Sequence, residues 1–167
     1  MPLYIFGIIL FELIFVAWID FKTKKISNYW IVANLVGFTI LAFLQPDIFK
    51  FNIKIFFLPL VFILVGYMLF TLNIMGAGDS KYLFSIFLLV PSSMHDLALY
   101  TLIYSTVVVG LISFMINLFY NSKKFRKAIE TKDVLLLKSI LGKKFTYAPV
   151  ILLSWVWFGF LAKVWQI

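Results

Sequence analysis

Four long runs without a charged side chain constrain this sequence more than any other feature. They cover residues 26–46, 55–78, 97–122 and 145–162. Each run reaches the roughly 18 residues that make a candidate membrane-spanning helix. Charged residues make up 13% of the chain, about half of their share in a soluble domain. The sequence therefore predicts an integral membrane protein.

Two further apolar segments raise the expected number of helices to six. Residues 1–19 are apolar except for Glu12, and residues 82–94 form a shorter run. The first segment lacks the basic start and the small-residue cleavage site of a signal peptide, so we expect it to remain in the protein. The expected fold is all-α: a single domain over residues 1–167, built as a polytopic bundle of about six transmembrane helices. We expect these helices over residues 3–19, 29–44, 55–74, 80–90, 97–120 and 147–165.

The basic side chains are distributed unevenly between the two sides of such a bundle. With six helices and the N-terminus outside, twelve of the fifteen Lys and Arg residues lie on the inner side, and only Lys50, Lys54 and Lys163 lie opposite. Cytoplasmic loops of membrane proteins carry this excess of positive charge. We therefore predict a multi-pass protein of the plasma (inner) membrane. The net charge of +8 then reflects orientation and attraction to anionic phospholipids, and we expect no nucleic-acid partner.

The segment 121–146, before the last helix, holds most of these basic residues. Apolar residues at positions 134–137, 140 and 141 lie among its lysines, a spacing typical of a basic amphipathic helix on a membrane surface. We interpret this cytoplasmic segment as an orientation anchor, with a substrate-binding surface as the alternative.

Asp20 and Asp79 are expected at the same membrane boundary. Asp20 closes the first helix in the stretch WIDFKTKKISN, and Asp79 opens the fourth helix after Gly76-Ala77-Gly78. Two helices lie between the acids, so both belong to the cytoplasmic side. If the first and fourth helices touch, the two carboxyl groups meet where low dielectric makes neighbouring negative charges costly. One of them then holds a proton that the other lacks.

Two carboxyl groups in these two states are what an aspartic protease uses. The ionised group takes a proton from water, the neutral group polarises the peptide carbonyl, and a tetrahedral diol forms. Gly76 and Gly78 fit as backbone support, since glycine permits a sharp turn and the close approach of a substrate strand or a neighbouring helix. The alternative is structural, because an interfacial Asp at a helix end and an N-cap Asp are both ordinary.

These motifs resemble those of the type IV prepilin peptidases, aspartic membrane proteases of the wider GxGD group. The matching residues are Asp20, Lys25-Ile26-Ser27-Asn28, Gly76-Ala77-Gly78-Asp79 with Lys81, and Tyr147-Ala148-Pro149 at the start of the last helix. Together they are more specific than Gly-x-Gly-Asp alone. The resemblance implies a six-helix membrane fold over essentially the whole chain, with Asp20 and Asp79 as the catalytic residues.

Two features of the sequence depart from this family. Ser27 stands where the family usually has proline, although serine also caps a helix well. The long members carry a cytoplasmic region with paired cysteines and methylate the new N-terminus, whereas this chain has no cysteine. The lack of cysteine also excludes disulfides, thiolate zinc sites and cysteine nucleophiles. The chain is similar to the short, peptidase-only forms of Tad/Flp pilus systems and to archaeal preflagellin peptidases. That similarity implies no N-methyltransferase activity, no S-adenosylmethionine and no metal.

The resemblance also implies a substrate and three further site residues. The substrate is a prepilin-like membrane protein, cut at the cytoplasmic face between a short basic leader and the hydrophobic helix that follows. Lys81 is expected near the two acids, where it tunes their ionisation or orients a carbonyl; the alternative is an interfacial lysine that snorkels to the surface. Lys25 and Asn28 share the basic turn after Asp20. Asn28 is first a turn or cap residue and second a substrate contact.

A different kind of GxGD protease is the first alternative function. Signal peptide peptidase and presenilin cut inside signal peptides or spanning helices, and they carry a Tyr before the first Asp and a late Pro-Ala-Leu motif. This chain has Ile19 before Asp20, and its late motif is Ala148-Pro149-Val150. The prepilin type therefore fits better.

A non-enzymatic assembly factor or small transporter is the second alternative. Such a protein would bind cations through Glu12, Asp20 and Asp79, but transport favours acids near the middle of the membrane along one path. Glu12 is the only acid well inside a span, and an intramembrane carboxyl group is costly without a partner. We interpret Glu12 as a protonated carboxyl group that is hydrogen-bonded within the bundle, with a third catalytic acid as the alternative.

Overall fold

The computed structural model describes residues 1–49, 52–71, 75–131 and 146–163, and the regular structure within these ranges is entirely helical. The elements in chain order are α1 (Leu3–Thr23), α2 (Asn28–Leu44), α3 (Ile53–Thr71), α4 (Ala77–Leu88), the 3-10 turn η1 (Ser92–Met94), α5 (His95–Tyr120), α6 (Ser122–Glu130) and α8 (Ala148–Leu161). The expected all-α class of membrane protein is confirmed.

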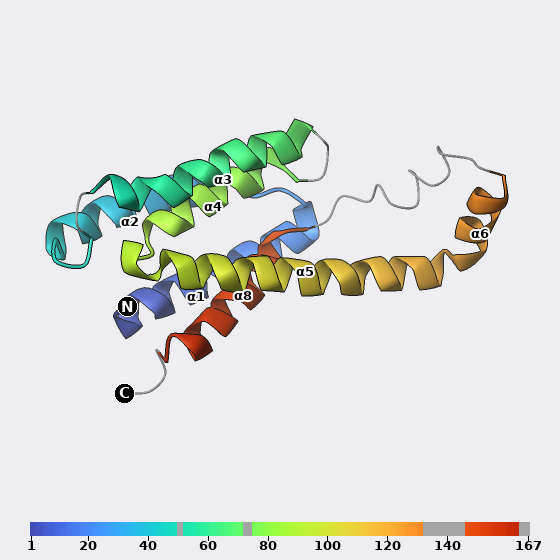
Figure 1. The fold of residues 1–167 in the computed structure, drawn as a ribbon. Helices are drawn as coiled ribbons and strands as arrows, with labels where there is room; N and C mark the ends of the chain where they lie inside the picture. The colour runs from blue at the N-terminus through green and yellow to red at the C-terminus, as the bar shows by residue number, and fades with distance from the viewer. Residues whose placement is uncertain (50–51, 72–74, 132–145, 164–167) are drawn as a thin grey trace.

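Two short helices, α4 and α8, form the centre of the bundle. Helix α4 packs against α2 and α3, and α8 packs against α1 and α5 (Figure 1). Eight of the twelve residues of α4 are buried, so its sequence contacts protein on most sides. Between α1 and α8, the rings of Phe6 and Trp155 stack with centroids 5.4 Å apart, and Trp155 Nε1 donates to the carbonyl of Phe6.

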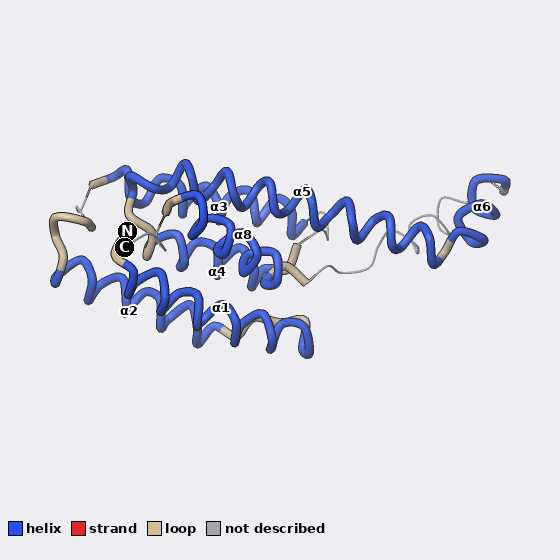
Figure 2. Tube along the Cα trace, turned by 90° about the horizontal axis from the view of Figure 1, so that it is seen from below, coloured by secondary structure: helices blue, strands red, loops and turns tan. Residues whose placement is uncertain are grey.

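Helix α5 extends past the other helices in both views and carries α6 at its far end (Figures 1 and 2). The C-terminal end of α1 and the N-terminal ends of α4 and α8 lie at the side of the bundle toward α6, and the N-terminus of the chain lies at the opposite side (Figure 1). Residues from three separate parts of the sequence therefore meet at one end of the bundle.

The helix ends follow from local sequence chemistry. Lys24 adopts a left-handed conformation with φ of 53° and ends α1, with its backbone N–H donating to the carbonyl of Asp20. Ser27 caps α2, because its Oγ accepts a hydrogen bond from the backbone N–H of Tyr29 at 3.3 Å. Pro149 stands in the first turn of α8, where its missing N–H has no intrahelical partner to lose. The expectation that Ser27 can cap this helix is confirmed.

Three of the described helices are long and apolar enough to cross a membrane: Leu3–Thr23, Ile53–Thr71 and Ser92–Tyr120. Helices α2 and α8 are apolar but have 17 and 14 residues. Helix α4, the expected fourth span, has 12 residues and a length of about 18 Å, less than the roughly 30 Å hydrocarbon core. Large apolar side chains such as Phe43 and Phe57 are exposed on the outside of the bundle, as the lipid-facing surface of a membrane protein requires.

Several helix boundaries differ from those expected from the sequence. Helix α1 continues to Thr23 instead of ending at residue 19, so Asp20 lies inside its last turn. Helix α4 begins at Ala77 instead of residue 80, because Gly76 already has an extended N-cap conformation. Helix α6 falls within the predicted basic segment, whereas the apolar positions 134–141 of that segment lie outside the described residues.

Candidate active site

Asp20 lies near the cytoplasmic end predicted for α1, and its side chain is fixed by the start of α8. The residue is 3% exposed. Its Oδ2 accepts a hydrogen bond from the backbone N–H of Ala148 at 3.2 Å. The first N–H groups of a helix have no intrahelical acceptor, so a carboxyl group is a favourable partner for them. Asp20 therefore connects α1 to the N-terminus of α8.

Asp79 occupies the first turn of α4, outside the three helices of spanning length. It is 8% exposed. Its Oδ2 accepts a hydrogen bond from the backbone N–H of Gly76 at 3.0 Å, and the backbone N–H of Asp79 donates to the carbonyl of Gly76 at 3.1 Å. Asp79 is thus the third residue of α4 and reaches back to its N-cap, whereas the sequence had suggested the N-cap position itself.

The two acids lie close enough to affect one another electrostatically. Burial raises the pKa of Asp79 from 3.8 to about 6, and the negative charge of Asp20 adds to the rise, although the hydrogen bond from Gly76 opposes it. The structure therefore places the two aspartates that the sequence singled out at the same end of the bundle, within electrostatic reach of one another.

Tyr147, the residue that precedes α8, is a third neighbour of this pair. Its hydroxyl group lies 2.8 Å from Oγ1 of Thr106 in α5. Burial raises the pKa of Tyr147, and the charge of Asp79 contributes to the rise. In the sequence, Tyr147 and Ala148 belong to the late motif, but neither is among the predicted site residues. Their motif position was the available signal, because a hydrogen bond across 128 residues leaves no local pattern.

Gly78 is needed where α4 meets the turn before α2. A Cβ atom at Gly78 would lie 3.3 Å from the carbonyl oxygen of Ile26, which is tighter than ordinary van der Waals contact. Gly76 has a φ of −76°, and no glycine within the described ranges has a positive φ. The prediction of close backbone approach is therefore supported at Gly78, and neither Gly76 nor Gly78 uses the left-handed conformation that favours glycine.

The three polar residues predicted to tune the site are on the surface. Lys81, Lys25 and Asn28 are exposed, and within the described residues neither lysine forms an ion pair with Asp20 or Asp79. Asn28 is the first residue of α2, in agreement with its interpretation as a residue at the helix start. Roles for these side chains in substrate contact stay predictions.

Glu12 belongs to a separate polar cluster deeper in the bundle. Its Oε1 accepts hydrogen bonds of 3.0 Å from Nδ2 of Asn34 and from the hydroxyl group of Tyr82. Nδ2 of Asn34 also donates to Oγ of Ser85 at 3.2 Å. The predicted hydrogen bonding of Glu12 within the bundle is confirmed.

Comparisons with known proteins bear on this arrangement of acids. The model of the type IV leader peptidase family matches residues 7–120, which include Asp20 and Asp79 and make up more than half of the chain. Ala148, the hydrogen-bond partner of Asp20, lies outside the matched region. Neither the curated proteins nor the solved structures gave a match. With both aspartates inside the matched region, the chain belongs to the type IV leader peptidase family.

Proposed function

We propose that this protein is a membrane-embedded aspartic endopeptidase that removes the basic leader of prepilin-like proteins at the cytoplasmic face of the plasma membrane. One observation carries the proposal: Asp20 and Asp79 are both buried, come from separate helices and interact electrostatically. Membership of a peptidase family supports this chemistry. In this proposal Asp20 and Asp79 are the catalytic residues, and the protein uses no metal and no S-adenosylmethionine.

Hydrolysis by such a pair requires one ionised and one protonated carboxyl group. The raised pKa of Asp79, about 6, supports Asp79 as the group that holds the proton. Asp20 then takes a proton from a water molecule whose oxygen adds to the carbonyl carbon of the peptide. At the same time the proton of Asp79 moves to the carbonyl oxygen, which gives a tetrahedral diol.

The second half of the reaction returns both acids to their starting states. Asp20 donates its proton to the amide nitrogen as the C–N bond breaks. Asp79 takes a proton from one hydroxyl group of the diol, which becomes the carboxyl group of the leader. The products are the leader with a new C-terminus and the mature protein with a new N-terminus.

The position of the acids at one end of the bundle supports the substrate class. Asp20 lies in the last turn of α1 and Asp79 in the first turn of α4, so the pair lies near the depth at which a spanning helix ends. A substrate helix beside the bundle would bring the junction between its polar leader and its apolar helix to that depth. The predominance of basic residues on the predicted inner side supports the cytoplasmic face.

Co-expression with a candidate prepilin tests the proposal. Wild type, Asp20→Asn and Asp79→Asn are compared by mass spectrometry of the membrane-bound prepilin. We expect wild type to remove the leader and both variants to leave it intact while they accumulate in the membrane at wild-type level. Efficient cleavage by either variant would exclude the pair. A cut inside the apolar helix would instead favour the signal-peptide-peptidase type of activity.

A further inference from the structure

An apolar groove opens between α1 and α2, apart from the two aspartates. Its volume is about 610 Å³, within the roughly 300–1,000 Å³ typical of ligand pockets. Ile8, Phe11 and Phe15 from α1 and Ile40 from α2 line the groove and are exposed on the outside of the bundle. The groove therefore opens sideways, toward the lipid in a membrane.

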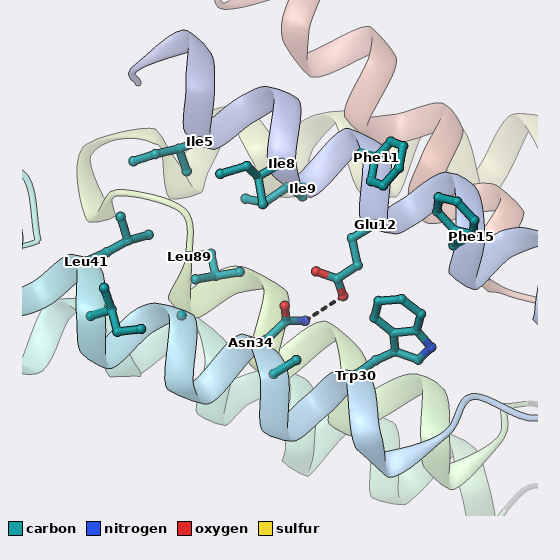
Figure 3. A pocket seen from close by; sticks show the side chains of 13 residues that line it. Ile5, Ile8, Ile9, Phe11, Glu12, Phe15, Trp30, Asn34, Leu41 and Leu89 are labelled. Atoms are coloured by element: carbon teal, nitrogen blue, oxygen red, sulfur yellow. Dashed lines mark hydrogen bonds between the residues drawn. The ribbon is translucent and has the colours of Figure 1, made fainter.

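Glu12 places a carboxyl group in the wall of this groove (Figure 3). Both donors that reach Glu12, Asn34 and Tyr82, bind the same oxygen, Oε1. Within the part of the chain that the structure describes, Oε2 has no hydrogen-bond partner, and it is not enclosed by protein atoms. A carboxyl group that faces an apolar environment is costly unless its free oxygen, ionised or protonated, finds a hydrogen-bond partner. The groove thus suits an occupant that is apolar along its length and carries a hydrogen-bonding group at one point.

We propose that this groove docks the apolar helix of the substrate and that Oε2 of Glu12 forms a hydrogen bond with a polar side chain of that helix. The inference rests on the proposed function, because it assigns a binding surface to the same peptidase. A hydroxyl or amide group of the substrate can supply this partner, because each of them can both donate and accept. The remaining contacts are with the aliphatic and aromatic lining.

The geometry of α1 gives the position of this polar residue in the substrate. Glu12 and Asp20 lie eight residues apart on one helix, which corresponds to about 12 Å along its axis. The lining residues Phe15 and Trp30 mark the end of the groove nearer to Asp20. A substrate helix laid along α1, with its cut bond at the level of Asp20, therefore brings its residue at about the eighth position after the cut to Glu12.

A phospholipid acyl chain is the competing occupant. It matches the apolar lining, but it has no hydrogen-bonding group for Oε2 of Glu12, and the groove would have no relation to the site of cleavage. A substrate helix accounts for both features, since its polar side chain meets Glu12 and its end leads to Asp20. The groove is therefore assigned to the substrate.

Blocking the groove tests this assignment. Gly37 lines the groove, and a Cβ atom there would meet only the side chain of Leu89, at 3.7 Å, so the larger side chain of Gly37→Leu fills the space without displacing backbone. The matched control is Gly110→Leu in α5, where a Cβ atom would have no neighbour within 4 Å. The probes are the prepilin that wild type cleaves in co-expression and a shortened peptide that ends six residues after the cut.

We expect wild type to cleave the full-length prepilin with a lower KM than the shortened peptide, because only the longer substrate reaches Glu12 and the far part of the groove. Gly37→Leu should remove most of this advantage, raising the KM of the full-length prepilin by about tenfold, whereas Gly110→Leu should keep it. An unchanged KM for Gly37→Leu, or an equal loss with both substrates, overturns the assignment. An equal loss with both substrates would mean that the substitution disturbs the fold. An unchanged KM is also the result expected if lipid fills the groove.

Cross-linking tests docking without catalysis. The chain has no cysteine, so a single Cys in the groove, Ala33→Cys, is placed in the inactive Asp20→Asn protein and paired with a Cys at the eighth residue after the cut of the prepilin. We expect a cross-link there and none from Gly110→Cys. Absence of the cross-link while wild type still cleaves the prepilin contradicts only the docking site. Cleavage by the Asp20→Asn protein itself contradicts the proposed function.

Discussion

Oδ2 of Asp20 accepts a hydrogen bond from the backbone N–H of Ala148 at 3.2 Å, across 128 residues of sequence. This contact joins the last turn of α1 to the start of α8. It positions one member of the acidic pair with a backbone donor, which keeps its place when side chains move. The same end of the bundle holds Asp79, whose own anchor is the N–H of Gly76. Each acid is therefore held by main chain.

The Asp20–Ala148 contact predicts different effects for two substitutions of Asp20. Asp20→Asn keeps an oxygen that can accept from Ala148, whereas Asp20→Ala leaves a buried N–H without a partner. We expect Asp20→Ala to be about 1–3 kcal/mol less stable than Asp20→Asn, with both variants inactive. Chemical unfolding in detergent micelles measures the difference. Equal stability of the two variants would show that the hydrogen bond is absent in the folded protein.

The raised pKa of Asp79 predicts that Asp79→Asn stabilises the protein above a certain pH. A carboxyl group whose pKa rises from 3.8 to about 6 on folding destabilises the folded state when it is ionised. Stability of the wild type should therefore fall as pH rises from about 4 to 6, whereas that of the variant should not. The gain in free energy of unfolding from Asp79→Asn is on the order of 3 kcal/mol above pH 6.5 and near zero at pH 4. Thermal unfolding of both proteins at pH 4 and pH 7 measures this gain. A gain of the same size at the two pH values would contradict the assigned titration.

The pH profile of cleavage follows from the same carboxyl group. If Asp79 must hold a proton, kcat/KM falls as pH rises through about 6, by roughly tenfold for each further pH unit. Initial rates in vesicles between pH 5 and pH 8 measure the profile, with reversal on return to pH 5.5 as the control for unfolding. A rate that is constant over this range would exclude Asp79 as the acid.

A close contact between α3 and α4 predicts that a larger residue at position 66 lowers the stability of the protein. A Cβ atom on Gly66 would overlap the side chain of Ser80, the residue after Asp79. Gly66→Ala should therefore separate the two helices, lower stability by about 1–3 kcal/mol and reduce cleavage, because α4 carries Asp79. Gly110→Ala, in open space on α5, is the control. Adding Ser80→Gly to Gly66→Ala should restore part of the lost stability, and a fully stable Gly66→Ala protein would argue against this packing.

The sequence was sufficient to predict the helices and the end of the bundle at which the acids meet. Long uncharged runs predict spanning helices because lipid excludes charge. Ser27 fits the start of α2, because its hydroxyl group can accept a hydrogen bond from the backbone N–H of Tyr29. The placement of Asp20 and Asp79 on one side of the membrane followed from the even number of expected crossings between them. These predictions depend on local composition or on the number of crossings, and neither requires knowledge of packing.

The remaining features depend on contacts between distant residues. Hydropathy does not distinguish a helix that is apolar because it faces lipid from one that is apolar because it is surrounded by protein, so the short, central α4 was expected as a span. The contact of Gly66 with Ser80 and that of Asp20 with Ala148 join separate helices and leave no periodic signal. The groove beside Glu12 is lined mainly by residues of α1 and α2, and such a space between two helices is a property of the assembled bundle.

The cleavage rate of the purified protein, in vesicles that also contain its prepilin, shows whether Asp20 and Asp79 work together. We expect Asp20→Asn and Asp79→Asn each to lower kcat/KM by at least about a thousandfold, and the double variant to be no slower than either single variant, since the two acids act as one unit. Losses that multiply in the double variant, or a single variant within tenfold of wild type, would contradict a shared catalytic pair.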